Sequence, residues 1–257
     1  MTRPNLARSN AERANYLRLV MPILMMVFWQ WSAVLINSPD YPTPVAVYHA
    51  FVFELTQEQM LYHLGMTLWR VILSFAFSMV LGVMFGIIMG RFPRLNELSD
   101  PVLILALNIP ALVTILLCYL SIGLVEAAAV TAVALNKIPT VVAMIREGAR
   151  MVDNELIDVA RVFRLSPATR FLRVFLPQLY PYIMASARTG LSLIWKIVLV
   201  VELIGRSNGV GFKLHTLFQF FDIAGILAYT FAFVAIIYLL EALIFRPLDK
   251  VVSRGRV

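Results

Sequence analysis

Four ionisable side chains lie within long apolar stretches of the sequence, where a charge is costly and is therefore usually paired or functional. They are Lys137, Arg188, Lys196 and Glu202. A lysine deep in such a stretch could hold a small anion, such as a sulfonate or a carboxylate, through its ammonium group. Lys196 could equally form a structural ion pair with Glu202 or Glu241, or extend its charged end to a water interface.

Asn108 is a further polar candidate, because it lies two residues before Pro110 in another apolar stretch. Asn108 and Pro110 predict a turn or a kink near a polar path that the ionisable side chains could line. Ordinary helix packing would also account for the two residues.

The residue types that most enzymes and metal sites need do not occur in suitable patterns. His49, His63 and His215 are scattered without the spacing of metal ligands, so no metal site is predicted. No Ser-His-Asp set and no pair of carboxylates can be assembled, which argues against a catalytic site. There is no G-x-x-x-x-G-K-[ST] phosphate loop, so the chain is not expected to hydrolyse ATP itself.

The composition indicates which kind of secondary structure carries these residues. Of the 257 residues, 60% are apolar and only 14% are charged, and the mean hydropathy is +0.81. Uncharged or nearly uncharged runs are long enough to cross a hydrocarbon core as helices, whose backbone satisfies its own hydrogen bonds. The sequence therefore predicts an all-α, polytopic membrane protein with six transmembrane helices, at residues 19–36, 71–90, 101–125, 127–145, 179–204 and 223–245.

The distribution of Lys and Arg predicts the orientation. If the N-terminus is cytoplasmic, the inner segments are 1–18, 91–100, 146–177 and 246–257, and they hold 16 of the 22 basic residues. The outer loop, 37–65, has no Lys or Arg, and its "VAVYHAFVFEL" has the spacing of a short helix. Both termini are therefore expected in the cytoplasm, with a core of five helices over 66–245. The net charge of +7 is explained by attraction of the basic segments to an anionic inner leaflet, so it does not require a nucleic-acid partner.

Three glycines in the second span, Gly82, Gly86 and Gly90, are spaced four residues apart and so share one helix face. This spacing predicts close packing against a second membrane helix, although chance occurrence is the alternative, since glycine is common in such helices.

The segment 146–177 is a charged cytoplasmic loop between the fourth and fifth spans. Its first half predicts an amphipathic helix, with Leu156, Ala160 and Phe163 on one face and Val159 beside them. Asp158 lies on the opposite face and can pair with Arg161, for a few tenths of a kcal/mol.

The second half of the loop predicts another short helix after a bend at Leu165–Ser166. Ser166 is suited to cap this helix and Pro167 to begin it, whereas Pro177 is expected to break it before the fifth span. The whole loop could be an amphipathic connector in the lipid headgroups or a docking element for a cytoplasmic partner.

The loop resembles the cytoplasmic loop of the permease subunits of bacterial ABC importers. That loop has the pattern E-A-A, three residues, Gly, nine residues, then I-x-L-P. Asp158-Val159-Ala160 stands at E-A-A, Arg164 at the Gly, and Val174-Phe175-Leu176-Pro177 at I-x-L-P, without a gap. Four further stretches resemble the nitrate/sulfonate/taurine branch of that family: "YPTPVAVYHAF", "HLGMTLWRVILSF", "SDPVLILALNIPAL" and "GLSLIWKIVLVVELIGRSNGVGF". The resemblance runs from about residue 41 to residue 212.

Two residues depart from the pattern. The family glycine ends the first loop helix in a left-handed conformation, which would cost Arg164 about 1 kcal/mol, so the bend could be built differently here. Val159 in place of Ala adds bulk to the face that would dock.

The resemblance implies a type I ABC importer permease in the bacterial inner membrane that acts as a homodimer. Each loop would sit in a groove of a cytoplasmic ATPase subunit, which binds ATP and Mg²⁺, and a periplasmic binding protein would deliver the solute. The permease itself would have no cofactor and would not be an enzyme. The coupling residues would be Asp158, Val159, Ala160, Arg161, Phe163, Arg164, Leu165, Ser166, Leu176 and Pro177. The solute path would include candidates among Lys196, Arg188, Glu202 and Asn108.

Two other classes of function compete with this one. A transporter driven by an ion gradient would need buried acidic groups and usually internal repeats, but only Glu202 and Glu241 are available and no repeat is visible. A membrane scaffold that recruits a cytoplasmic protein would account for the basic loop but not for the ordered resemblances elsewhere.

Overall fold

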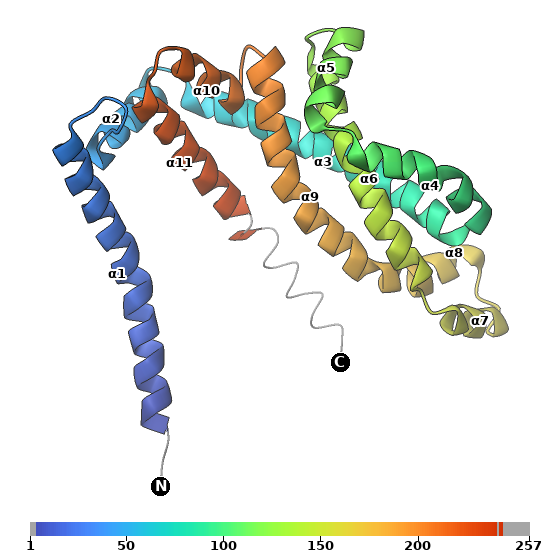
Figure 1. Ribbon diagram of the computed structural model, residues 1–257. Coiled ribbons are helices and arrows are strands. Elements are labelled where there is room, and N and C mark those ends of the chain that lie inside the picture. The colour runs from blue at the N-terminus through green and yellow to red at the C-terminus, as the bar shows by residue number, and fades with distance from the viewer. Residues whose placement is uncertain (1–3, 241, 244–257) are drawn as a thin grey trace. The chain divides into compact units, whose positions relative to one another are not determined.

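A computed structural model describes residues 4–240 and 242–243, with side chains from residue 20 onward, and that part of the chain is helical without any strand (Figure 1). Glu241 and the predicted cytoplasmic tail, 246–257, lie outside the described residues, as do the last residues of the sixth predicted span. The elements in chain order are α1 (Pro4–Ile36), α2 (Pro44–Thr56), α3 (Met60–Arg91), α4 (Pro93–Asn108), α5 (Ala111–Ile122), α6 (Glu126–Arg150), α7 (Asn154–Val162), α8 (Pro167–Arg170), a π-helical turn (Phe171–Phe175), α9 (Leu176–Gly205), α10 (Val210–Gln219) and α11 (Ile223–Leu240).

The chain divides into two compact units. The first consists of residues 1–60 and 216–235. Within it, the indole Nε1 of Trp29 donates a hydrogen bond to the carbonyl of Pro42 (3.1 Å), which fixes the connection between α1 and α2. The hydroxyl of Thr43 caps α2 by accepting from the Ala46 amide, and Pro44 is its first residue. The short helix expected in the outer loop is thereby confirmed.

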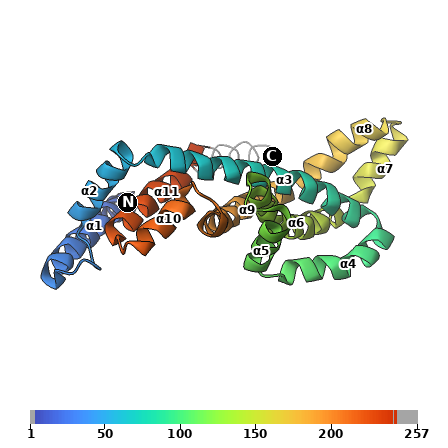
Figure 2. The same ribbon diagram turned by 90° about the horizontal axis from the view of Figure 1, so that it is seen from above.

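The second unit, residues 61–215 and 236–257, is organised around α6. This helix packs against α4, α5 and α9, and Figure 2 shows it among those three helices and α3. The interior where α6 meets α9 is apolar and includes Val141, Ile145, Phe175 and Leu179, all of which are buried. An apolar core of this kind positions the charged groups described below.

The three glycines of α3 pack directly against α6, as their spacing predicts. A Cβ added at Gly82, Gly86 or Gly90 would lie 2.5, 2.7 or 2.6 Å from the Cβ of Val141, Ile145 or Ala149, respectively. Those distances are too short for two carbon atoms, so only glycine allows the two helices to approach this closely.

Three described helices are long and apolar enough to cross a membrane: α3, α6 and α11. The apolar part of α1, Val20–Ile36, is shorter, and α9 is long but carries Arg188, Lys196 and Glu202. Helices α3, α6, α9 and α11 lie at four of the six predicted spans. Helix α1 lies at the first predicted span, and the α4–α5 pair lies at the third.

The third predicted span, 101–125, is not one straight helix. This stretch is part of α4 and α5, whose axes are bent by 97° at Ile109–Pro110. Ile109 is extended, the conformation that a following proline ring favours because it disfavours the helical region for the residue before it. The predicted turn at Asn108 and Pro110 is thus confirmed, and it divides the helix instead of kinking it.

We expect Gly86→Ala to destabilise the protein by about 1–3 kcal/mol, because its methyl group would overlap the side chain of Ile145. Gly65→Ala is a matched control on the same helix, since nothing lies within 4 Å of the added carbon. The control should leave the thermal midpoint of the detergent-solubilised protein unchanged or raised. Equal midpoints for the two variants would contradict the close α3–α6 contact.

Candidate functional site

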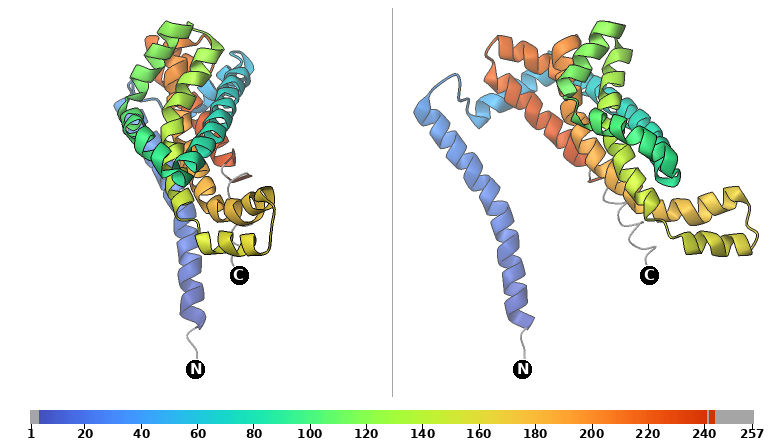
Figure 3. Two further views of the ribbon diagram at one scale, coloured as in Figure 1. Left: turned by 90° about the vertical axis from the view of Figure 1, so that its right-hand side faces the viewer. Right: turned by 45° about the vertical axis from the view of Figure 1, so that its right-hand side comes forward.

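In the charged loop 146–177, the first helix after α6 is α7. Two side chains hold its first turn. Figure 3 shows α7 and α8 together at one end of α6 and α9. A carboxylate oxygen of Asp153 accepts a hydrogen bond from the Glu155 amide (2.8 Å), which caps the helix. The Asp153 amide in turn donates to Gln178 Oε1 on α9 (2.9 Å). The start of α7 is therefore attached to α9.

The end of α7 is a Schellman motif built on an arginine. Arg164 has a φ of +52°, its amide donates to the Arg161 carbonyl (2.8 Å), and the Leu165 amide donates to the Ala160 carbonyl (3.1 Å). This is the pattern that a left-handed residue produces after a helix, normally a glycine. The bend therefore has the same left-handed form that a glycine would give. Arg164 adopts this conformation at a cost of about 1 kcal/mol.

The predicted apolar face of α7 divides into a buried and an exposed part. Ala160 is buried together with Ile157, whereas the side chains of Leu156, Val159 and Phe163 are 49%, 51% and 74% exposed. We call the last three the apolar stripe of α7. They lie at positions i, i+3 and i+7 and so share one face of the helix. A stripe of this kind on a short helix is unusual for a surface that stays in contact with water.

The polar face of α7 agrees with the sequence analysis. The guanidinium Nη1 of Arg161 lies 2.8 Å from a carboxylate oxygen of Asp158, and both side chains are more than half exposed. An exposed pair of this kind contributes only a few tenths of a kcal/mol.

The second loop helix begins as predicted but does not end at Pro177. Ser166 Oγ accepts from the Thr169 amide (3.2 Å) and Pro167 is the first helical residue. The chain then passes through the π-helical turn into α9, with Leu176 and Pro177 in the first turn of that helix. The wider π turn moves the preceding carbonyls away from the proline ring, so the helix continues past Pro177.

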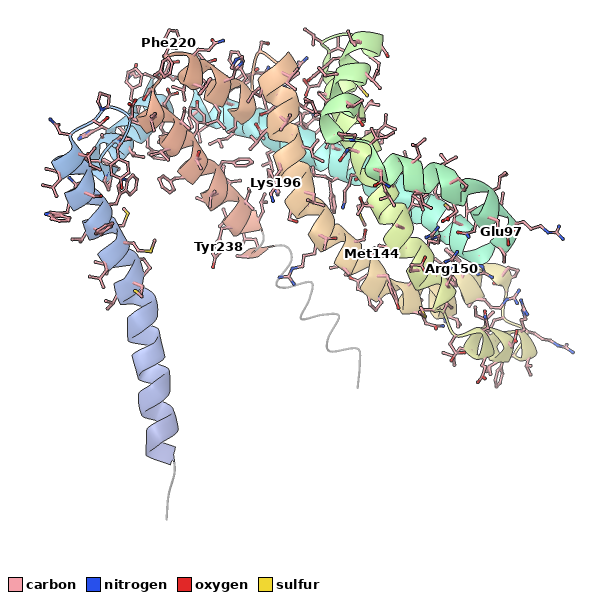
Figure 4. All side chains as sticks on the ribbon, in the orientation of Figure 1. Glu97, Met144, Arg150, Lys196, Phe220 and Tyr238 are labelled. Atoms are coloured by element: carbon pink, nitrogen blue, oxygen red, sulfur yellow. The ribbon has the colours of Figure 1, made fainter. Side chains whose placement is uncertain are left out.

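The candidates for a solute path do not share one environment. Lys196, Arg188 and Asn108 are exposed on the isolated chain, and Figure 4 shows Lys196 on the flank of α9. The Asn108 amide group donates to the Ile104 carbonyl (2.7 Å) one turn earlier in α4. Glu202 is different, because its side chain is completely buried. The alternative partner for Lys196, Glu241, lies outside the described residues.

Lys137, at the middle of α6, is also buried. Its Nζ has no hydrogen-bond partner in the part of the chain that the structure describes, and its Cε lies 3.0 Å from the position that a Cβ of Gly190 would occupy. The absence of a side chain at Gly190 on α9 therefore provides the space for this lysine.

The charge of Glu202 is balanced by Arg70, which the sequence analysis had not assigned a role. Arg70 Nη1 lies 2.7 Å from Glu202 Oε1, and Arg70 Nε lies 2.6 Å from Glu126 Oε1. Glu126 is also paired with Arg206 Nη2 (2.8 Å). Arg70 and Glu202 are almost completely buried, whereas Glu126 is partly exposed, and this ion-pair cluster joins α3, α6 and α9.

The loop between α9 and α10 is held by the same cluster. Arg70 donates to the carbonyl of Asn208 (3.0 Å) and to its side-chain oxygen. The second oxygen of Glu202 accepts from the Gly211 amide (2.8 Å) and from the hydroxyl of Thr67 (2.9 Å). Every carboxylate oxygen of Glu202 is therefore satisfied, which a buried charge requires.

A sequence signal for this cluster does exist. Arg70, Glu126 and Glu202 each stand near one end of an apolar run, all on the outer side in the predicted orientation. Spans that carry isolated opposite charges at the same depth are candidates for pairing. What the sequence does not supply is which helices are neighbours.

Solved structures share this helical architecture. The chain aligns with the MetNI methionine ABC transporter in inward-facing conformations at a TM-score of 0.63 and 17% identity, covering 77% of this chain and 99% of the other. It also aligns with an amino acid ABC transporter at a TM-score of 0.56 and 22% identity, covering 76% and 93%. At these identities the likeness establishes the fold, which is that of an ABC transporter permease.

Residues 82–256 match the family described as binding-protein-dependent transport system inner membrane component, and the chain belongs to this family. The permease protein SsuC of Bacillus subtilis, named for aliphatic sulfonates transport, is 30% identical over 79% of this chain and 74% of its own length. The taurine transport system permease protein TauC of Escherichia coli is 25% identical over 86% and 82%. The nitrate import permease protein NrtB of a Synechocystis strain is 27% identical over 57% and 53%. The resemblance to the sulfonate, taurine and nitrate branch is thereby confirmed.

We expect Arg70→Met to destabilise the protein by about 3–5 kcal/mol, because it leaves the Glu202 carboxylate buried without its cation. The double variant Arg70→Met, Glu202→Gln should recover part of this loss, since the unpaired charge is then removed. The thermal midpoints of the two single variants and the double variant measure the coupling. Additive effects would show that the two side chains do not interact.

Proposed function

We propose that this chain is the permease subunit of an ATP-driven importer and forms the path of a small anionic solute through the membrane. In this function the loop 146–177 docks to a cytoplasmic ATPase subunit, which binds and hydrolyses ATP with Mg²⁺. A periplasmic binding protein delivers the solute, and a second copy of the chain completes the path. The permease itself contributes helices and contacts, and no catalytic group.

The apolar stripe of α7 carries the docking proposal. Leu156, Val159 and Phe163 expose large apolar side chains along one face of α7, which is fixed at both ends by hydrogen bonds. Burying such a stripe in a groove is a common mode of helix recognition, and the free energy comes from the apolar area removed from water. Two residues of the stripe, Val159 and Phe163, also lie within the segment that matches the family's loop pattern, with Val159 in the position of the first Ala.

The topology of the proposal follows the distribution of basic residues. Six spans, with the described bend dividing the third, place both termini and the loop 146–177 on the cytoplasmic side. The Arg70 cluster then lies near the periplasmic side, where the binding protein would approach. In this arrangement Glu202 has a structural role, because its two oxygens already have partners within the chain.

The solute class rests on the relatives and on charge. The related permeases are named for aliphatic sulfonates, taurine, nitrate and bicarbonate, each of which carries an anionic group. Lys196 is an exposed cation on α9 and could attract such a group once a second copy encloses the path. Arg188 and Asn108 are weaker candidates, because Arg188 lies nearer to the cytoplasmic side in the predicted orientation and Asn108 is the last residue of α4.

Docking is tested by placing a charge on the apolar stripe. We expect Val159→Asp to weaken co-purification with the co-encoded ATPase about tenfold or more, because a carboxylate would be buried against the partner. Asn154→Asp adds the same charge to the opposite side of α7 and should leave association unchanged. Equal association for both variants, with normal membrane insertion, would contradict the docking face.

Transport is tested in vesicles that contain the chain, its co-encoded ATPase and its binding protein. The solutes to compare are taurine, an alkyl sulfonate, nitrate and an aromatic acid, and uptake of one of them should require ATP. Lys196→Met should reduce that uptake about tenfold, a loss of one favourable charge contact, while Lys196→Arg should retain most of it. Full uptake by Lys196→Met would return Lys196 to a structural role, and uptake without ATP would contradict the importer.

A further inference from the structure

Three arginines from different elements converge on one pocket beside the loop. The pocket has a volume of about 280 Å³, and Arg91 from the end of α3, Arg161 from α7 and Arg170 from α8 line it. We call it the arginine pocket. None of the described residues that line it is acidic. Three guanidinium groups around one cavity repel each other unless an anion lies between them.

The donors in the arginine pocket are only partly used within the described chain. Arg170 Nε is buried and has no hydrogen-bond partner there. The Arg91 guanidinium carbon lies 4.9 Å from the centre of the Phe175 ring, a stacking contact that leaves the N–H edge of the group available. Among the residues that the structure describes, Arg161 alone of the three has a carboxylate partner, Asp158, and that pair is exposed.

The shape and position of the arginine pocket favour a particular anion. Planar guanidinium groups bind phosphate through paired N–H donors, and several of them can share the oxygens of one phosphate. Arg91 directly follows the apolar run 71–90, so the pocket lies where a membrane helix leaves the hydrocarbon region. Phe171 and Phe175, stacked at 5.5 Å, provide an apolar wall beside the cations.

The geometry points to the arginine pocket as a binding site for the phosphate of an anionic phospholipid headgroup. The lipid would bridge the end of α3 to both loop helices from the membrane side. Ile157 and Arg161, which line the pocket, lie on a different side of α7 from the apolar stripe, so lipid and ATPase could be bound together. The site does not depend on the solute or on the identity of the partner.

The site is tested by titrating the purified full-length chain in detergent with short-chain phosphatidylglycerol, with phosphatidylcholine as the neutral comparison. We expect phosphatidylglycerol to bind at least tenfold more tightly, and Arg170→Gln to reduce its affinity about tenfold. Arg170→Lys keeps the charge but loses the paired donors and should give an intermediate affinity. Arg173→Gln removes an exposed arginine of the same segment outside the pocket and should have little effect.

Three results would overturn the proposal. Equal losses for Arg170→Gln and Arg173→Gln would show attraction to the general basic surface. Inorganic phosphate that displaces phosphatidylglycerol at similar concentrations would assign the pocket to a free phosphate compound instead of a lipid. Unchanged affinity in Arg170→Gln, with a normal thermal midpoint, would show that the pocket does not bind the headgroup.

Discussion

The second unit depends on one buried guanidinium group between two carboxylates. Arg70 pairs with Glu126 and Glu202, and both Arg70 and Glu202 are buried, where an ion without partners would cost several kcal/mol. Each partner belongs to a different long helix, so the pairing fixes how far α3, α6 and α9 can slide along one another. The same arginine holds the loop at Asn208. An apolar interface alone would tolerate such sliding far better, because its contacts are not directional.

The close contact of α3 with α6 is the second constraint. Because Gly82, Gly86 and Gly90 have no side chains, the two helices approach closely over the part of α3 and α6 that leads to the loop. The loop helices are in turn connected to this pair of long helices through Gln178 and through the π-helical turn into α9. A force applied to α7 would therefore reach α9 and α6 through stiff elements, as the proposed function requires.

Local sequence patterns predicted most of the helices and the beginning of the second loop helix. The Ser166-Pro167 cap and the Asp158–Arg161 pair depend on residues within one turn, so propensity and spacing are enough to predict them. The predictions failed where a proline or a charged residue acts against its usual tendency. Pro177 continues a helix that a π turn widens, and Arg164 takes a left-handed conformation. In each case the surrounding structure outweighs a local preference of about 1–3 kcal/mol.

The sequence by itself determined that the chain is helical, lies in a membrane and carries a charged helical loop, because hydropathy and helix capping are properties of neighbouring residues. It also supplied the motif from which the permease family was inferred. Only the tertiary structure decided which charges meet. Arg70 lies 56 residues from Glu126 and 132 from Glu202, and three arginines from α3, α7 and α8 share one pocket. Such partners are chosen by how the helices pack, and that depends on contacts summed over the whole unit.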